Sequence, residues 1–291
     1  MDQKRRAVVA GSFYAANRQS LYQQIKDCFL HQIGPQALPT KNEKRDRKIM
    51  GIISPHAGFM FSGPVAAHNY LQLSLEKTPP TIIILGPNHR GLGGDISLMS
   101  SGQWETPLGM IEIDQLIASE MIAYDEKRMI QDDFQAHLFE HSIEVQLPFL
   151  QFIYPADEYK IIPICIANQQ LLSMKYLTDI ICKTIKDNYR AFLLIASSDF
   201  NHYESQESTK SKDAEGIKQI LHMDTDLFYK TIQENGASIC GPGPISVVME
   251  TCKRLGINRG KLLKYATSGD VSGMNDQVVG YASIIFNKFL S

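Results

Sequence analysis

Apolar residues along this chain alternate between two patterns. Short continuous apolar runs, among them TIIIL at 81–85 and AFLLIAS at 191–197, are typical of strands covered on both faces of a sheet. Between most of these runs, apolar residues recur every three or four positions, as Leu21, Ile25 and Phe29 do, which is the period of a helix. Strands that alternate with helices predict an α/β fold: one domain over residues 1–291 with a mostly parallel central sheet flanked by helices.

The pattern predicts the bounds of each element. Strands are predicted at 48–53, 81–86, 95–100, 108–113, 159–166, 190–196, 261–267 and 278–286. Helices are predicted at 18–33, 63–75, 114–124, 141–153, 169–187, 210–221, 224–234 and 243–256. The segment WETPLGMIEID at 104–114 is typical of a hairpin arm. The mixed-charge segment KNEKRDRK at 41–48 is interpreted as a solvated connection.

Composition narrows the class of protein. The chain has 291 residues, of which 44% are hydrophobic, and a net charge of −2, so nothing attracts it generally to nucleic acid or to an anionic membrane. Its five cysteines are scattered without a C-x-x-C pair, which favours a reducing compartment. No apolar run approaches the roughly 20 residues of a membrane span. We therefore expect a cytoplasmic protein that contacts neither nucleic acid nor membrane.

Side chains that bind metal or move protons follow three of the predicted strands. His56 follows the first strand and His89 the second, each shortly after a proline and before a glycine. Asp199 and His202 follow the strand at 190–196. Ligands of parallel sheets bind outside the carboxyl ends of the strands, so these groups are expected at one edge. The matching context of the two histidines favours an imidazole metal site over two histidines that are merely hydrogen-bonded at loop starts.

Two other groups leave alternatives open. Asp199 and His202 share a face if a helix begins there, with Asp199 orienting His202 as a general base. Alternatively, Asp199 caps that helix and His202 is exposed, and spacing alone does not decide between the two. Cys240 precedes a predicted helix, where the thiol pKa is lowered and the thiolate becomes a good ligand. A small buried hydrophobic residue is the strong alternative for a lone cysteine.

The segment HLFEH at 137–141 matches the H-x-x-E-H pattern of one class of zinc peptidase. That pattern requires a helix and a separate downstream ligand, whereas Pro148 limits any helix here and no such ligand is evident. A position beside the site is therefore favoured for His141 and Glu144. Glycine-rich nucleotide motifs and the G-x-S-x-G motif do not occur in the sequence, which disfavours nucleotide-dependent and serine-hydrolase mechanisms.

Eight fragments together resemble the Memo family. They are AGSFY, PHAGF, SGPVAAHNY, ILGPNH, EHSIEVQLPFL, SSDFNH, ICGPGPI and YATSGDVSG, in order from residue 10 almost to the C-terminus. The resemblance implies a fold similar to the catalytic subunit of class III extradiol dioxygenases of the LigB type, which hold non-haem Fe(II) with two histidines and a carboxylate.

The resemblance also implies roles for single residues. His56 and His89 match the two histidines of the Memo site, and Cys240 matches the family cysteine that replaces the dioxygenase carboxylate. His202 resembles the dioxygenase acid/base histidine, with Asp199 in the same SSDF-x-H motif, and His141 is expected to border the pocket.

Family members are reported to bind iron or copper and to show redox-type activity. An animal member binds phosphotyrosine peptides, and microbial members are associated with radical-SAM and AMMECR-type proteins. Asn201 and Tyr203 differ from the residues that flank the corresponding histidine in the animal protein, so peptide binding is not carried over from it.

A His-His-Cys donor set suits Fe, Cu or Zn better than Mg or Ca. A thiolate is also oxidisable, so ring cleavage does not follow from the fold. The first hypothesis is a site for Fe(II) or Cu with oxidoreductase chemistry, held by His56, His89 and Cys240, with His202 oriented by Asp199 for proton transfer. The alternatives are a module that binds a peptide or small molecule without metal, and a zinc hydrolase.

Overall fold

The predicted apolar runs form the centre of a nine-stranded sheet within residues 3–40 and 45–288, which the computed structural model describes. Its strands are β2 (Ile49–Ser54), β3 (Thr81–Pro87), β4 (Ile96–Leu98), β7 (Ile130–Asp132), β8 (Lys160–Ile166), β9 (Phe192–Ser197), β10 (His202–Glu204), β11 (Gly260–Thr267) and β12 (Val278–Asn287). Their order is β10-β12-β2-β9-β3-β8-β4-β7, and β11 pairs with β12. Part of the predicted solvated connection, residues 41–44, lies outside the described residues.

The four central strands are parallel, and the flanking pairings make the sheet mixed. β2, β9, β3 and β8 run in the same direction, whereas β12 is antiparallel to β2 and β4 is antiparallel to β8. Every residue of β2, β3 and β9 is buried, as expected for continuous apolar runs with helices on both faces. The predicted α/β class is thus confirmed, and its parallel part is the centre of the sheet.

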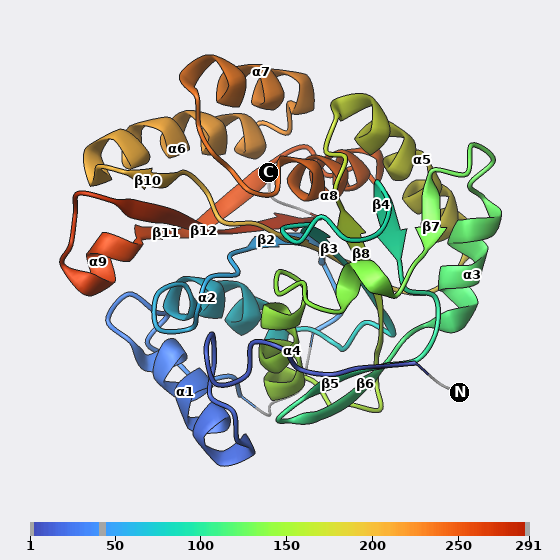
Figure 1. Ribbon diagram of the computed structural model, residues 1–291, viewed down its shortest axis with the longest axis horizontal. Coiled ribbons are helices and arrows are strands. Elements are labelled where there is room, and N and C mark those ends of the chain that lie inside the picture. Colours follow the sequence, from blue (N-terminus) through green and yellow to red (C-terminus); the bar gives the residue numbers. More distant parts are fainter. Residues whose placement is uncertain (1–2, 41–44, 289–291) are drawn as a thin grey trace.

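Helices cover both faces of the sheet (Figure 1). On one side lie α1 (Arg18–Leu30), α2 (Gly63–Ser74) and α4 (Leu147–Ile153); on the other lie α5 (Leu171–Asp187), α6 (Gln206–Leu221), α7 (Thr225–Asn235) and α8 (Pro242–Arg254). α2 packs on β2 and β12, and α8 packs on β2, β3 and β9. α3 (Gln115–Ala123) packs on α5, and the short α9 (Ser268–Ser272) follows β11. Within the described ranges, no helix combines the length and apolar character that a membrane crossing requires.

A second, small sheet carries the N-terminal segment. β5 (Gln103–Thr106) and β6 (Gly109–Glu112) form the hairpin expected from the sequence, and β1 (Lys4–Arg5) pairs with β5 in parallel. β1 is absent from the predicted strands because its two residues are both charged and show no strand period.

The predicted helix at 141–153 is wrong in its first half. The helix α4 begins at Leu147 and is preceded by a 3₁₀ turn over Glu144–Gln146. Pro148 fits the first turn of a helix and not its interior. Upstream, the Glu140 carboxylate accepts hydrogen bonds from the backbone N–H groups of His141 and Ser142, so this segment is held in a non-helical conformation.

Candidate metal centre

The predicted site residues lie together at the carboxyl ends of the central parallel strands. His56 lies just beyond β2, His89 beyond β3 and Asp199 beyond β9, and β9 lies between β2 and β3. Because these three strands are parallel, their following loops leave the sheet at the same end. Cys240 immediately precedes Gly241, the N-cap of α8, and its backbone N–H donates to the Asp199 carbonyl at 3.3 Å.

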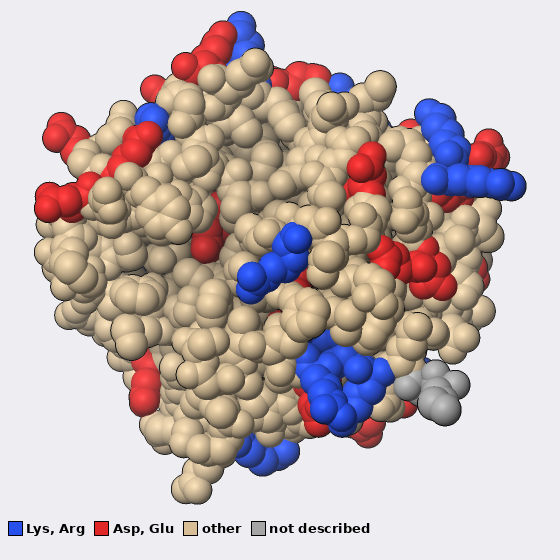
Figure 2. Space-filling view, viewed as in Figure 1, with Lys and Arg blue, Asp and Glu red and all other residues tan. Residues whose placement is uncertain are grey.

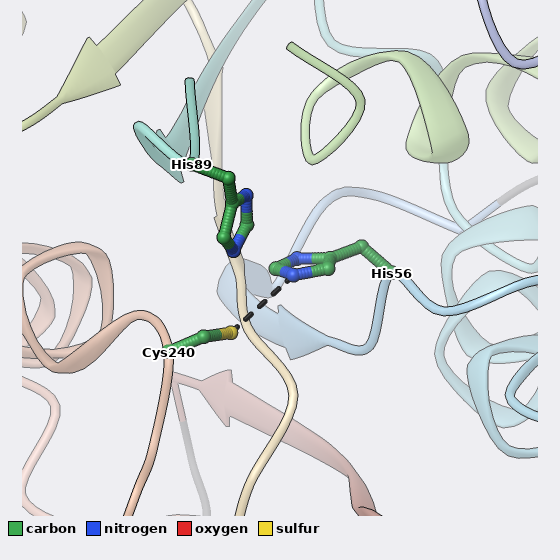
Figure 3. Close-up of side chains that lie close together, drawn as sticks. All are labelled: His56, His89 and Cys240. Atoms are coloured by element: carbon green, nitrogen blue, oxygen red, sulfur yellow. Dashed lines mark hydrogen bonds between the residues drawn. The ribbon is translucent and has the colours of Figure 1, made fainter. Parts of the chain in front are cut away.

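The two imidazoles and the thiol point toward one another (Figure 3). One donor atom from each of His56, His89 and Cys240 lies within 4.8 Å of the other two, and Cys240 Sγ is 3.3 Å from His56 Nε2. These residues are 33 to 184 positions apart in the sequence, so only the fold brings them together. The geometry is that of a candidate three-ligand metal site.

The hydrogen bonds of Ser197 determine the tautomer of His56. The single hydroxyl proton of Ser197 is donated to the Ser142 carbonyl at 2.6 Å, and its oxygen accepts from Gln146 Nε2 at 2.8 Å. In the 2.9 Å contact between Ser197 Oγ and His56 Nδ1, the imidazole must therefore donate. This leaves the lone pair of His56 on Nε2, which faces Cys240, as a metal ligand requires.

His89 is held in the same way by a buried carboxylate. Glu140 accepts from the His89 backbone N–H at 2.6 Å and from Nδ1 at 2.9 Å. Burial alone would raise the pKa of Glu140, but its hydrogen bond to His89 and the charges of His89 and His141 lower the pKa below its usual value. An ionised Glu140 fixes the proton of His89 on Nδ1 and leaves Nε2 free to bind a metal.

Cys240 accepts a hydrogen bond from the Asp199 backbone N–H, with the nitrogen 3.1 Å from Sγ. The sequence predicted a lowered thiol pKa, and this prediction is wrong for the metal-free protein. Burial, with the nearby Asp199 carboxylate, raises the pKa of Cys240 well above its usual value, and its hydrogen bonds to Ser198 and Asp199 only partly oppose the increase. Cys240 is therefore a thiol near neutral pH until a cation replaces its proton.

The donor set fits a transition metal. In both imidazoles Nδ1 donates a hydrogen bond to a polar acceptor, which is the usual arrangement of metal-ligating histidines. The thiol adds a soft donor at 3.3 Å from one of these imidazoles. Imidazole with thiolate suits Zn, Cu or Fe, whereas Mg and Ca prefer oxygen ligands.

Asp199 and His202 do not interact as the sequence predicted. No helix begins at Asp199: residues 202–204 form β10, and the cap of the next helix, α6, is Ser205. Asp199 Oδ1 instead accepts from the backbone N–H of His56 at 2.8 Å, and burial raises the pKa of Asp199 to about 6. His202 Nδ1 donates to the Ser238 carbonyl at 2.9 Å. Ser238 therefore orients the ring, and Nε2 is the nitrogen that can accept a proton.

His141 lies beside the three ligand candidates. Its ring centroid is 4.7 Å from that of His89 and 5.3 Å from that of His56. Burial chiefly lowers the pKa of His141 to about 4, so the ring is neutral near pH 7. His89, Glu140 and His141 also form a group whose donor atoms lie close together. In that group, however, the Glu140 carboxylate already accepts a hydrogen bond from the Nδ1–H of His89.

The H-x-x-E-H match at 137–141 has no helix to support it. His137 ends a 3₁₀ turn and is fully buried against Trp104, with ring centroids 5.6 Å apart. Glu144, expected beside the site, is instead fully buried and bound to Arg5. The residues that sequence reasoning missed are Ser197, Gln146 and Ser238, together with Glu140 in its role as the partner of His89. They lie up to 141 positions from the groups they contact, and no local pattern marks them.

Removing the acceptor of His56 is expected to weaken metal binding without unfolding the protein. Ser197→Ala leaves Nδ1 without the partner that fixes its tautomer, and we expect the affinity for metal to fall about 10–100-fold. Ser283→Ala is the matched control, because Ser283 is a buried sheet serine whose hydroxyl has no hydrogen-bond partner among the described residues. Competition titration with a chelator measures both; equal affinities would contradict the assigned role of Ser197.

Metal binding is expected to release one proton from Cys240 and none from His56. Burial, with His141 and His89 nearby, lowers the pKa of His56, so this ring is already neutral near pH 7. The Cys240 pKa is raised, so this ligand makes affinity increase about tenfold per pH unit between pH 6 and 8 and decrease as the pH falls. Calorimetry in buffers of different ionisation enthalpy counts the protons; Cys240→Ser should release one fewer, and an unchanged count would contradict the assignment.

Comparison with known proteins agrees with the resemblance noted in the sequence. The family model described as Memo-like protein matches residues 5–285. A MEMO1 family protein of Methanopyrus kandleri is 42% identical over 98% of this chain and 99% of its own length. MEMO1 family proteins of Saccharolobus solfataricus and Sulfolobus acidocaldarius are 43% and 44% identical, over 98% and 96% of this chain and 100% and 97% of their own lengths. The chain therefore belongs to the Memo-like family.

Proposed function

We propose that this protein is a non-haem metal protein that binds iron or copper through His56, His89 and Cys240 and uses the metal in oxidoreductase chemistry of the dioxygenase type. The observation that supports the proposal best is the orientation of the two imidazoles. Ser197 and Glu140 each accept a hydrogen bond from the Nδ1–H of one histidine, so both Nε2 lone pairs are directed to the space beside the thiol. Such pre-orientation is what a metal site needs and what two solvated loop histidines do not have.

At such a site, separate residues would bind the metal, stabilise the thiolate and transfer a proton. A bound Fe(II) or Cu(I) supplies one-electron and O₂ chemistry. His56, His89 and Cys240 hold the metal, and the N–H of Asp199 stabilises the sulfur in its thiolate form. His202, oriented by Ser238, accepts or donates a proton of the substrate through Nε2.

Oxygen consumption tests this function. Protein loaded with Fe(II) or Cu(I) under anaerobic conditions is mixed with catechol-like substrates and air-saturated buffer, and dissolved O₂ is recorded. His202→Gln is expected to bind metal normally and to turn over about 10²–10⁴-fold more slowly, because proton transfer is removed while the metal ligands are unchanged. His222→Gln, an exposed histidine at the end of α6, is the control and should keep full turnover.

The outcomes separate the proposal from its rivals. Metal-loaded protein that consumes no O₂ with any substrate would favour a binding module or, with zinc bound, a zinc hydrolase with a metal-bound water. Turnover that His202→Gln leaves unchanged would remove His202 from the mechanism.

A further inference from the structure

A cavity of about 340 Å³ lies between α6 and β11, which are neighbours at the left of Figure 1. None of the residues that line it belongs to the candidate metal centre. Its volume is at the lower end of the roughly 300–1,000 Å³ range of small-molecule sites. The cavity is therefore large enough for a small ligand and is not explained by the proposed function.

One wall of the cavity is apolar. Ile217 and Leu221 lie four residues apart on one face of α6. Leu262 and Tyr265 face them from β11, although residues three apart in a regular strand point to opposite faces. The register of β11 against β12 shifts between positions 262 and 264, and this irregularity brings both side chains to the same side. The Tyr265 hydroxyl donates to Asp213 at 2.7 Å, so its polar end is satisfied and its ring is free to contact a ligand.

The remaining lining residues are mostly basic. Lys218, His222 and Arg259 are exposed beside the apolar wall, and Lys210 pairs with Asp270 at 3.1 Å. No lining residue is acidic, although the chain as a whole carries a net charge of −2. The local excess of positive charge is thus a property of this place and not of the composition.

We propose that this cavity binds a free aliphatic monocarboxylate, with its tail between Ile217, Leu221, Leu262 and Tyr265 and its carboxylate at Arg259 and Lys218. Burial of the tail supplies the apolar contribution, in proportion to the surface removed from water. A planar guanidinium matches a carboxylate with two parallel hydrogen bonds, and the ammonium of Lys218 adds a second positive charge. A neutral alcohol of the same length would keep the first contribution and lose the second.

Isothermal titration of the purified full chain with octanoate and with octanol tests the proposal. Octanoate is expected to bind saturably at one site per chain, and octanol about tenfold more weakly or worse, because a hydrogen bond to a charged group is lost. Arg259→Glu should weaken octanoate by about tenfold or more while leaving octanol unchanged. Leu262→Trp should fill the cavity and weaken both ligands.

Lys261→Glu is the matched control, because it reverses a charge on the same strand at an exposed residue that does not line the cavity. It should bind octanoate as the wild type does. The proposal would be overturned by absence of saturable octanoate binding, by equal affinity for octanoate and octanol, or by octanoate binding that neither Arg259→Glu nor Leu262→Trp changes. Sedimentation showing that a second copy covers this cavity, with dissociation in Leu262→Trp, would overturn it as well.

Discussion

Arg5→Met is expected to lower the free energy of unfolding by about 3–5 kcal/mol, a large fraction of the stability of a typical domain. Arg5 is fully buried, is paired with the equally buried Glu144, and has its guanidinium 4.5 Å from the Trp104 ring centroid. Glu144 also accepts from the backbone N–H groups of Val8 and Val9. Methionine would fill the space but leave the Glu144 charge buried without its partner, which is the costly way to break a buried pair.

The same substitution is also expected to weaken metal binding. Arg5 donates to the carbonyls of His137 and Glu140, so it holds the loop whose carboxylate orients His89. Urea unfolding and a metal titration measure the two effects on the same protein. Lys4→Met is the control, because the Lys4–Glu105 pair is exposed and such pairs contribute about 0–1 kcal/mol. If Arg5→Met were as stable as Lys4→Met, the buried Arg5–Glu144 pair would not be a major source of stability.

Cys240→Ser is expected to lower the affinity for iron or copper by more than about 100-fold. Losing a hydrogen-bond partner of a ligand costs about 10–100-fold, and losing the ligand itself should cost more. Serine keeps nearly the same shape but is a poor ligand for soft metals. The fold should be retained, because the residue lies in a loop before α8 and is only half-buried.

Cys182→Ser is the matched control for this experiment, since Cys182 is a buried free cysteine of α5 that belongs to neither candidate metal group. Its metal affinity should equal that of the wild type. Anaerobic titration with Fe(II) and Cu(I), together with circular dichroism to verify folding, measures both variants. A folded Cys240→Ser protein with wild-type affinity would remove the thiol from the site.

Strong local patterns made much of the fold predictable. The apolar run at 81–86 is β3 at Thr81–Pro87, and the periodic segment at 169–187 is α5 at Leu171–Asp187. Weak local patterns failed, as at the two charged residues of β1 and at β10, where His202 and Tyr203 gave no strand signal. β10 exists because it pairs with β12, an interaction between segments more than 70 positions apart that no local window contains.

The candidate site shows the same division. The ends of buried strands marked His56 and His89, because a titratable residue after an apolar run is unusual. The partners of these residues were not predictable: Ser197 and Glu140 are identified only by their contacts, across 141 and 51 positions. Asp199 was expected to orient His202, and it instead binds the backbone of His56, since the loop after β9 turns toward β2. Sequence spacing indicates which groups meet at the edge of a sheet, and the fold decides which of them touch.

Metal analysis of protein purified anaerobically without an affinity tag measures whether His56, His89 and Cys240 bind a metal. Wild-type protein is compared with His56→Ala and His89→Ala after reconstitution with Fe(II), Cu(I) or Zn(II). We expect about one iron or copper per wild-type chain and loss of that metal in both variants, because each removes one of three converging ligands. If the wild-type protein takes up no metal, or if the variants retain it in full, these residues do not form a metal site.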